Sequence, residues 1–258
     1  MMRSPIALLV LVLAAPAAPG ETPPCPGNAD ALGTARVLAV DAATTPRVGR
    51  KQFSQTLPLA PKEVVLTFDD GPEPGGTGRV LDALARECVR AMFFLLGRSA
   101  LAHPDLARRA LAEGHIVAHH TFSHPLLDRM SLAAAEAEID RGFAAVDAAL
   151  YAERASGRAA EQAPKTPFFR FPGFASSPAL LERLERRGIV VFGADLWAGD
   201  WIAMSPQYEL ELVLRRLEAT RGGIVLFHDT KRQTAAMLPA FLRALKSRDY
   251  RNVVPVPR

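Results

Sequence analysis

Two adjacent carboxylates and a pair of histidines are the residues of this sequence whose types and spacing most suggest chemistry. Asp69 and Asp70 follow a short apolar run, 64–68, and precede a Gly-Pro dipeptide. At the end of a strand the two acids can diverge, so that one could bind a metal ion while its neighbour accepts a proton. His120 and His124 are four residues apart, and on one turn of helix both rings would point the same way. Two histidines and one carboxylate, with a coordination position left open, form a catalytic zinc-type ligand set.

Each of these patterns has a structural alternative. An isolated Asp-rich turn usually serves only to hydrogen-bond the backbone, and a capped turn can hold two histidines that bind nothing. The two patterns together favour chemistry, because each of them follows a separate predicted strand.

The elements that must position these residues alternate along the chain. Apolar and β-branched runs predict strands, and the segments between them have the capping serines and closing glycines of helices. The predicted strands are 64–68, 91–96, 115–118, 168–171, 189–194 and 224–227, with a short one at 253–254. The predicted helices are 77–90, 104–113, 132–150, 178–188, 206–222 and 234–247. This alternation predicts parallel strands with helices outside them.

An open doubly wound sheet and a barrel both fit this order of elements. No Gly-rich phosphate-binding loop follows the first strand, so nothing supports nucleotide binding. The polar residues Asp70, His120, Asp200 and His228 follow different predicted strands, and Arg170 lies on another. Side chains at the carboxyl ends of so many strands converge only in a ring or a strongly curved sheet. We therefore expect an α/β fold, a distorted (β/α) barrel with about seven strands.

Several segments resemble the motifs of a known family. Thr67–Pro72 and His120–Pro125 are similar to the first two motifs of the polysaccharide deacetylases with a NodB homology domain, carbohydrate esterase family 4. Phe169–Gly173, Asp195–Trp201 and Ile224–Asp229 resemble that family's Arg-x-Pro, Asp…Asp-Trp and Leu-x-His motifs. The motifs occur in the family's order and extend over nearly all of the chain beyond its N-terminal part, which implies a barrel of the NodB type.

The resemblance implies a metal site and a base. Asp70, His120 and His124 would hold one divalent metal ion, usually zinc, with cobalt or another divalent ion as alternatives. Asp69 would be the general base that activates water. Arg170 would pair with Asp69, orienting its carboxylate and lowering its pKa.

The resemblance also implies an acid and a binding pocket. His228 would protonate the leaving amine, and Asp200 would hold and charge-stabilise His228. The backbone N–H of Gly173 would help to stabilise the oxyanion. Trp201 and Leu226 would line a small pocket for the acetyl methyl group.

This sequence departs from the family's pattern at three places. Gly173-Phe174 stands where the family often has Tyr-Gly, so the pocket wall beside the N–H donor can differ. His119 stands where Asn is common, either as a hydrogen-bonding partner of the site or as a neutral packing residue. The fourth motif is one residue longer than usual, which leaves the role of Asp195 open.

The composition and the N-terminal sequence limit the classes of protein to which this chain can belong. The 258 residues are 49% hydrophobic, which suits one domain with a substantial core. The net charge of +4 comes from 31 basic residues without a Lys/Arg tract, so we expect no nucleic-acid partner. Residues 1–20, with Arg3 before an apolar run, predict a secretory signal peptide, with an uncleaved anchor as the alternative. Residues 21–60 predict an N-terminal arm packing on the barrel, and residues 61–258 the deacetylase domain.

Export makes the cysteines informative. Cys25 and Cys88 would meet an oxidising compartment, the periplasm or the exterior, and could form a disulfide. Cys88 also fits a helical apolar pattern, in which it would be a buried free thiol. No later run is long enough to span a membrane after signal cleavage.

The resemblance predicts a metal-dependent hydrolase that removes N-acetyl groups from an amino-sugar polymer, either peptidoglycan or a chitin-like oligosaccharide. One alternative is a catalytically silent cell-envelope protein that binds such a glycan. Another is a deacetylase acting on O-acetyl esters or small molecules. The complete set of motif residues favours an active deacetylase over a silent protein, whereas the choice between N- and O-deacetylation, the glycan and the oligomeric state stay open.

Overall fold

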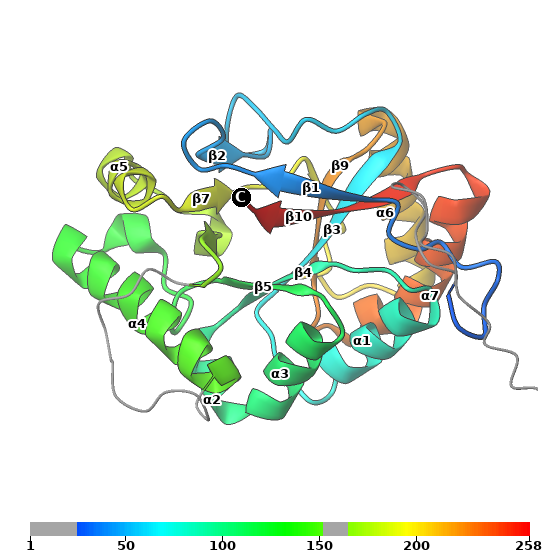
Figure 1. Ribbon diagram of the computed structural model, residues 1–258, viewed down its shortest axis with the longest axis horizontal. Helices are drawn as coiled ribbons and strands as arrows, with labels where there is room; N and C mark the ends of the chain where they lie inside the picture. Colours follow the sequence, from blue (N-terminus) through cyan, green and yellow to red (C-terminus); the bar gives the residue numbers. More distant parts are fainter. Residues whose placement is uncertain (1–24, 152–164) are drawn as a thin grey trace, which may run out of the picture.

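The computed structural model describes residues 25–151 and 165–258. The segment predicted as a signal peptide lies outside these residues, as does most of the segment between the predicted helix 132–150 and the predicted strand 168–171. In the described chain one ten-stranded sheet curves through the molecule with helices outside it, and every strand pair is parallel (Figure 1). The strands are β1 (Arg36–Val40), β2 (Arg47–Val48), β3 (Glu63–Asp69), β4 (Met92–Leu95), β5 (Ile116–His119), β6 (Phe168–Phe169), β7 (Val190–Phe192), β8 (Leu196–Trp197), β9 (Gly223–His228) and β10 (Arg251–Pro257). The helices are α1 (Thr77–Arg86), α2 (Gly97–Ala102), α3 (Pro104–Ala112), α4 (Leu132–Tyr151), α5 (Pro178–Arg186), α6 (Pro206–Thr220) and α7 (Arg232–Ser247).

Strand β3 is the centre of this sheet. It pairs with β9 from Val64 to Asp69 on one edge, and with β4 near its carboxyl end on the other. All seven of its residues are buried, as expected for a parallel strand covered on both faces. Its neighbours therefore bring their carboxyl ends to the same edge of the barrel as Asp69.

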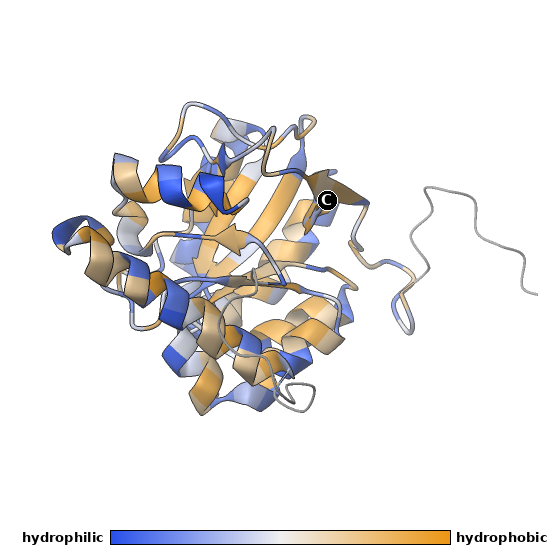
Figure 2. Ribbon diagram, turned by 60° about the vertical axis from the view of Figure 1, so that its left-hand side comes forward, coloured by the Kyte–Doolittle hydropathy of each residue, from blue (hydrophilic) through white to orange (hydrophobic). Residues whose placement is uncertain are grey.

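The alternation of side chains along β3 separates two apolar layers. Val64, Leu66 and Phe68 pack with the apolar faces of the outer helices. Val65 packs in a second cluster with residues of other strands, on the inner face of the sheet. Because side chains alternate with a period of two, Asp69 points to the inner face as Val65 does. Figure 2 shows the strands largely in hydrophobic colours, with hydrophilic residues on the outer sides of the helices.

The predicted distorted α/β barrel is confirmed, and its strand count is higher than about seven. Strands β2 and β8 have two residues each, too few for a periodic pattern. Strand β10 is longer than predicted and continues through two prolines, because its edge pairs with β1, a segment more than two hundred residues earlier. Helix α2 was also not predicted, because six residues are too short to show an apolar stripe.

The predicted N-terminal arm supplies part of the sheet. Strand β1 pairs with β10 and β2 pairs with β7, so two of its segments continue the barrel. A boundary between arm and domain at residue 60 stays a prediction. Among the described residues, no helix combines the length and the apolar character that crossing a membrane requires.

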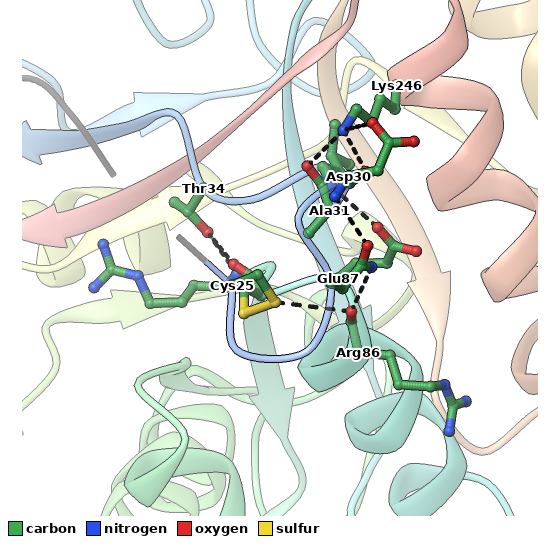
Figure 3. Close-up of a disulfide and its surroundings, with 11 residues drawn as sticks. Cys25, Asp30, Ala31, Thr34, Arg86, Glu87 and Lys246 are labelled. Carbon is green, nitrogen blue, oxygen red and sulfur yellow. Dashed lines mark hydrogen bonds and ion pairs between the residues drawn. A yellow bond between two sulfur atoms is a disulfide. The ribbon is translucent and has the colours of Figure 1, made fainter. Parts of the chain in front are cut away.

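Cys25 and Cys88 form a disulfide that fastens the start of the described chain to the turn after α1 (Figure 3). Cys88 lies beyond the end of α1, with a left-handed φ of 48°, and is not the buried helical thiol that was the alternative. Polar contacts reinforce the bridge: Leu32 donates its N–H to Glu87, and the Lys246 ammonium pairs with Asp30 at 2.6 Å. Since this turn leads into β4, the bridge lies at the amino ends of the strands, away from Asp69.

Candidate active site

The sequence-predicted polar residues meet at the carboxyl ends of the central strands. Asp69 is the last residue of β3 and stands opposite His228, the last residue of β9, in the strand register. His119 ends β5, and His120 follows it directly. Arg170 comes immediately after β6. The parallel register thus gathers side chains that are up to 159 positions apart in the sequence.

The two acids reach the same point because the backbone turns between them. Asp69 keeps its strand conformation, whereas Asp70 has a φ of 77°, in the left-handed region. As a result, the Nε2 atom of His120 lies 3.6 Å from Asp70 Oδ1 and 3.9 Å from Asp69 Oδ2. The expected divergence of the acids at the strand end is therefore a change of backbone direction that lets both face one site.

Asp70, His120 and His124 form a cluster that fits a metal ion. One ligand atom from each residue lies within 4.8 Å of the others, and His124 Nε2 is 3.3 Å from Asp70 Oδ1. Within the described chain, Asp70 Oδ1 is buried and has no hydrogen-bond partner, an arrangement that is costly unless a cation or another donor completes it. Two imidazole nitrogens and one carboxylate are a donor set suited to zinc and to other divalent ions.

The protonation of His120 also suits a ligand. Its Nδ1 lies 2.7 Å from the carbonyl oxygen of Arg170, so this nitrogen must donate, and the lone pair is left on Nε2 toward Asp70. Burial lowers the pKa of His120 to about 3. The imidazole is therefore neutral at ordinary pH, as metal binding requires.

The two histidines are not carried by a turn of helix, and that prediction is wrong. Residues 120–124 form an irregular loop in which Thr121 and His124 both have positive φ. The His124 N–H donates to the Thr121 hydroxyl at 3.0 Å, and Ser123 donates to Glu138 of α4. The rings converge because this loop doubles back on itself, which the spacing of the histidines alone could not distinguish from a helical turn.

Arg170 fixes the position of Asp69 from inside the barrel. Its guanidinium is fully buried and donates to Asp69 Oδ1 at 2.7 Å and to the Thr67 hydroxyl at 2.9 Å. Its other donors reach the carbonyl oxygens of Phe192 and Gly193. Such a buried, hydrogen-bonded charge pair holds the carboxylate in one orientation.

The pKa of Asp69 is raised, and not lowered as expected, because this carboxyl is buried. Desolvation raises the pKa of this carboxyl above its ordinary value, and the charge and hydrogen bond of Arg170 offset only part of that increase. For this fully buried carboxylate, the loss of solvation outweighs the attraction of the neighbouring guanidinium. Arg170 thus limits the rise of the pKa rather than producing a net decrease.

His228 is held as a charged imidazole by Asp200. Its Nδ1 donates to Asp200 Oδ1 at 2.8 Å, and its backbone N–H donates to Asp200 Oδ2 at 2.6 Å. Burial opposes the charge, but the hydrogen bond and charge of Asp200, with Asp69 and Asp70 beyond, raise the pKa of His228 to about 9. At neutral pH this ring therefore carries the proton that a general acid needs.

The three residues predicted to contact substrate are less closely tied to this cluster. Trp201 is half exposed, and its ring centre lies 6.1 Å from that of His228. Gly173 is the middle residue of the short 3₁₀ turn Pro172–Phe174 and has a φ of 56°; the first N–H groups of such a turn lack intrahelical partners. Leu226 is buried in β9 and pairs with Trp197 of β8. The roles of all three in substrate binding stay predictions.

Two residues that the sequence left open have structural surroundings. His119 is buried against the edge of Phe143, and burial lowers its pKa to about 3, so it is the neutral packing residue that was one of its alternatives. Asp195 accepts hydrogen bonds from Arg50, Thr56 and Ile224. It thereby joins the N-terminal segment to β9 and does not face the site.

Sequence reasoning missed three residues behind the site. Thr67 bridges Arg170 and the carbonyl oxygen of Val225, and its place in the first motif was the signal that could have indicated it. Thr234 and Glu209 lie behind Asp200. They belong to two different helices, and no motif joins them.

A cavity of about 630 Å³ opens beside the metal cluster. Asp70 and His124 line it together with residues of the α2 region, of the loop after β3 and of the segments around Ser123 and Thr230. Arg98, Ser99, His103 and Glu73 give this wall a polar and mixed-charge surface. A substrate extending from the cluster would therefore meet hydrogen-bonding groups here.

Comparisons with known proteins agree with this geometry. Residues 57–192 match the family model described as polysaccharide deacetylase. The chain is 34% identical over 192 residues to the peptidoglycan-N-acetylglucosamine deacetylase PgdA of Listeria monocytogenes, covering 74% of this chain and 38% of that protein. It is 32% identical over 212 residues to a chitooligosaccharide deacetylase of a Bradyrhizobium species, covering 76% of this chain and 90% of that protein.

A solved structure extends the similarity to three dimensions. The peptidoglycan deacetylase of Bdellovibrio bacteriovorus matches with a TM-score of 0.74 at 32% sequence identity, over 86% of this chain and 58% of that one. The chain thus spans less than two thirds of the Listeria and Bdellovibrio proteins, and most of the Bradyrhizobium one.

Proposed function

Because this chain belongs to the polysaccharide deacetylase family, we propose that it hydrolyses N-acetyl groups on an amino-sugar polymer, peptidoglycan or a chitin-like oligosaccharide. The observation that carries the proposal is the convergence of a buried acid, a charged imidazole and a metal-type cluster at one point. Asp69 and His228 are register partners, and the Asp70 carboxylate lies within 3.9 Å of Nε2 of His228. Amide hydrolysis needs a base that accepts a proton from the attacking water and an acid that protonates the leaving nitrogen, both within reach of the same amide group.

The first requirement is a strong nucleophile and a polarised carbonyl. Asp70, His120 and His124 would hold one divalent ion, which would supply a Lewis acid that lowers the pKa of water and polarises the amide. Asp69, fixed by Arg170, would accept the proton from the attacking water. Zinc is the metal we propose, with cobalt or another divalent ion as alternatives.

The second requirement is departure of the amine. An amine leaves only when its nitrogen is protonated, and His228 carries that proton at neutral pH. Asp200, fully buried behind the ring, holds the imidazole through Nδ1 and leaves Nε2 to face the substrate. We assign His228 as the general acid and Asp200 as the group that orients it.

The remaining assignments concern the acyl group. The N–H of Gly173 would donate to the developing oxyanion, as backbone donors do at the start of a helical turn. Trp201 and Leu226 would contact the acetyl methyl group. These assignments are supported by the motif match and by the place of Trp201 next to His228.

The disulfide supports an extracytoplasmic location, because such bonds persist in oxidising compartments. We propose that residues 1–20 direct export to the periplasm or the exterior. Amino-sugar polymers of the cell envelope would be accessible there.

Acetate release from a panel of substrates tests the function. Metal-loaded protein should release acetate from peptidoglycan or from chitin oligomers. Chelation should reduce the rate to background, and adding zinc back should restore it. Comparing amide-linked with ester-linked acetyl groups in the same assay distinguishes N-deacetylation from O-deacetylation.

The matched control is Asp69→Asn, which preserves the size of the side chain and removes the base. It should lose at least about a hundredfold in turnover. If metal-loaded wild-type protein binds these glycans but releases no acetate from any of them, the chain is instead a silent glycan-binding protein.

A further inference from the structure

Behind Asp200 lies a second buried carboxyl that the proposed mechanism does not use. Glu209, on α6, is 0% exposed. Its Oε1 lies 2.9 Å from the hydroxyl of Thr234 on α7, and that hydroxyl lies 2.8 Å from Asp200 Oδ2. The three residues therefore form a continuous chain of hydrogen-bonding groups from α6 through α7 to the partner of His228.

This hydrogen-bond chain needs one more hydrogen than two ionised carboxyls would leave it. Asp200 already accepts two hydrogen bonds from His228, one from the ring and one from the backbone. The Thr234 hydroxyl has one hydrogen but stands within hydrogen-bond distance of two carboxyl oxygens. If both carboxyls were ionised, one of those short oxygen–oxygen contacts would contain no hydrogen.

A proton on Glu209 satisfies both contacts. Glu209 then donates to the Thr234 oxygen, and Thr234 donates its own hydrogen to Asp200 Oδ2. The other oxygen of Glu209, Oε2, is buried and has no hydrogen-bond partner in the described chain. Leaving a neutral carbonyl-type oxygen unpaired costs much less than leaving part of a carboxylate charge unpaired.

We propose that Glu209 is a protonated positioning residue, which acts through Thr234 to hold Asp200 in the orientation that His228 needs. The inference rests on the proposed function for its effect on turnover. The proton itself is a property of the folded chain, whatever the activity.

The electrostatic surroundings of Glu209 also favour its protonated form. Burial and the negative charge of Asp200 raise the pKa of Glu209 to about 7, against smaller opposing effects of Thr234 and His228. Asp200 and His228 are the charged groups that act on this carboxyl. The neighbouring Gln233 side chain is neutral and donates to the carbonyl oxygen of Asp200.

Pairs of variants separate a hydrogen-bond donor from a charge. Glu209→Gln keeps the shape and a donor toward Thr234, whereas Glu209→Met keeps the bulk and removes the donor. Thr234→Ser keeps the hydroxyl, and Thr234→Val removes it from a side chain of the same shape. We expect Glu209→Gln and Thr234→Ser to retain kcat within about twofold, and Glu209→Met and Thr234→Val to lose about tenfold in kcat with KM unchanged.

Two results in this assay would overturn the proposal. If Glu209→Gln lost as much turnover as Glu209→Met, the residue would act as an anion and not as a donor. If Thr234→Val kept wild-type kcat, the hydrogen bonds from Glu209 through Thr234 would not position Asp200. Because Thr234→Val changes only one hydroxyl, it remains informative even if Glu209→Met does not fold.

Thermal unfolding gives a readout that does not depend on the reaction. A raised pKa in the folded state contributes stability below pH 4.5, the ordinary value, and that stability is lost as the pH rises through about 7. The melting temperature of the wild type should therefore fall by several degrees relative to Glu209→Gln between pH 5 and pH 7.5, and then stay level. Parallel melting curves would show that Glu209 carries no extra proton. If the wild type were inactive but its melting temperature fell relative to Glu209→Gln as expected, the proposed function would be refuted and the protonated Glu209 would stand.

Discussion

The adjacent acids Asp69 and Asp70 are suited to different roles because the backbone changes direction between them. Asp69 belongs to β3, faces the interior of the barrel and is 2% exposed. Asp70 follows in a left-handed conformation, and its Oδ1 lies near the Nε2 atoms of both His120 and His124. Burial and an Arg170 partner suit a residue that handles a proton, whereas an unpartnered oxygen between two imidazoles suits a metal ligand.

This division predicts different failures for two conservative variants. Asp70→Asn should weaken zinc binding by at least about tenfold, because it removes the only carboxylate of the ligand set. Asp69→Asn should keep zinc affinity and lose turnover. Calorimetric titration of zinc beside the acetate assay measures both quantities, and equal loss of zinc by the two variants would contradict the assignment.

A second prediction at this scale concerns Asp200. The pKa of His228 is raised to about 9 against burial, chiefly by the hydrogen bond and charge of Asp200. In Asp200→Asn the folded-state pKa of His228 should fall, so the ring loses its proton at a lower pH. The alkaline limb of the pH–rate profile should move down by about one to two pH units.

Glu211→Gln is the control for the Asp200 variant. This residue is exposed on α6, where its carboxylate accepts a hydrogen bond from Gln207. Removing its charge should leave the pH profile unchanged, because surface charges at a distance are screened. A shift of equal size in both variants would show that net charge, and not the contact with His228, governs the profile.

Among the elements, helix α4 positions the loop that carries the two proposed ligand histidines, His120 and His124. Glu138 accepts hydrogen bonds from Ser123, and Gly142 packs against the backbone of Thr121 and Phe122. A Cβ atom on Gly142 would lie 2.5 Å from the carbonyl carbon of Thr121. The helix and the loop therefore touch backbone to backbone, which only glycine permits.

Replacing Gly142 should therefore weaken metal binding, although this residue is not one of the proposed ligands. In an ordinary helix Gly→Ala stabilises by up to about 1 kcal/mol. Here we expect Gly142→Ala to destabilise by about 1–3 kcal/mol, because the loop must move to admit the methyl group. Zinc affinity should fall by about tenfold as the histidines lose their alignment. Urea unfolding and zinc titration measure the two effects.

Ala144→Gly is the matched control on the same helix. Ala144 is exposed, so the change alters helix propensity by about 1 kcal/mol without touching the loop. It should lower stability and leave zinc affinity intact. If Gly142→Ala were as stable as the wild type and bound zinc equally well, the contact of α4 with the loop would not position the ligands.

At the scale of the whole molecule, the disulfide and the active site lie at opposite ends of the strands. Cys88 precedes β4 at the amino end of the sheet, whereas Asp69 and His228 end β3 and β9. The bridge joins two cysteines that are 63 positions apart in the sequence. Its contribution should therefore appear in stability and not in chemistry.

Removing the bridge should lower the free energy of unfolding by roughly 4 kcal/mol, because the cross-link restricts the unfolded chain. The Cys25→Ala/Cys88→Ala variant should keep kcat and KM near wild-type values under conditions where it is folded. Asp30→Ala, which breaks only the exposed ion pair with Lys246, should change stability little. A large loss of kcat in the folded Cys25→Ala/Cys88→Ala variant would show that the bridge affects the active site.

The sequence by itself determined the order of the longer strands and helices, the distorted barrel and the residue types at the site, because apolar periodicity and motif spacing are local properties of the chain. The tertiary structure alone decided that the His120–His124 pair lies on a looped segment, that Cys25 bonds to Cys88, and that burial outweighs Arg170 in setting the pKa of Asp69. Glu209 and Thr234 show the reason most clearly. They are ordinary helix residues in the sequence, and only the packing of α6 on α7 brings them behind Asp200. Burial and contact depend on every element that surrounds a residue, so no local pattern contains them.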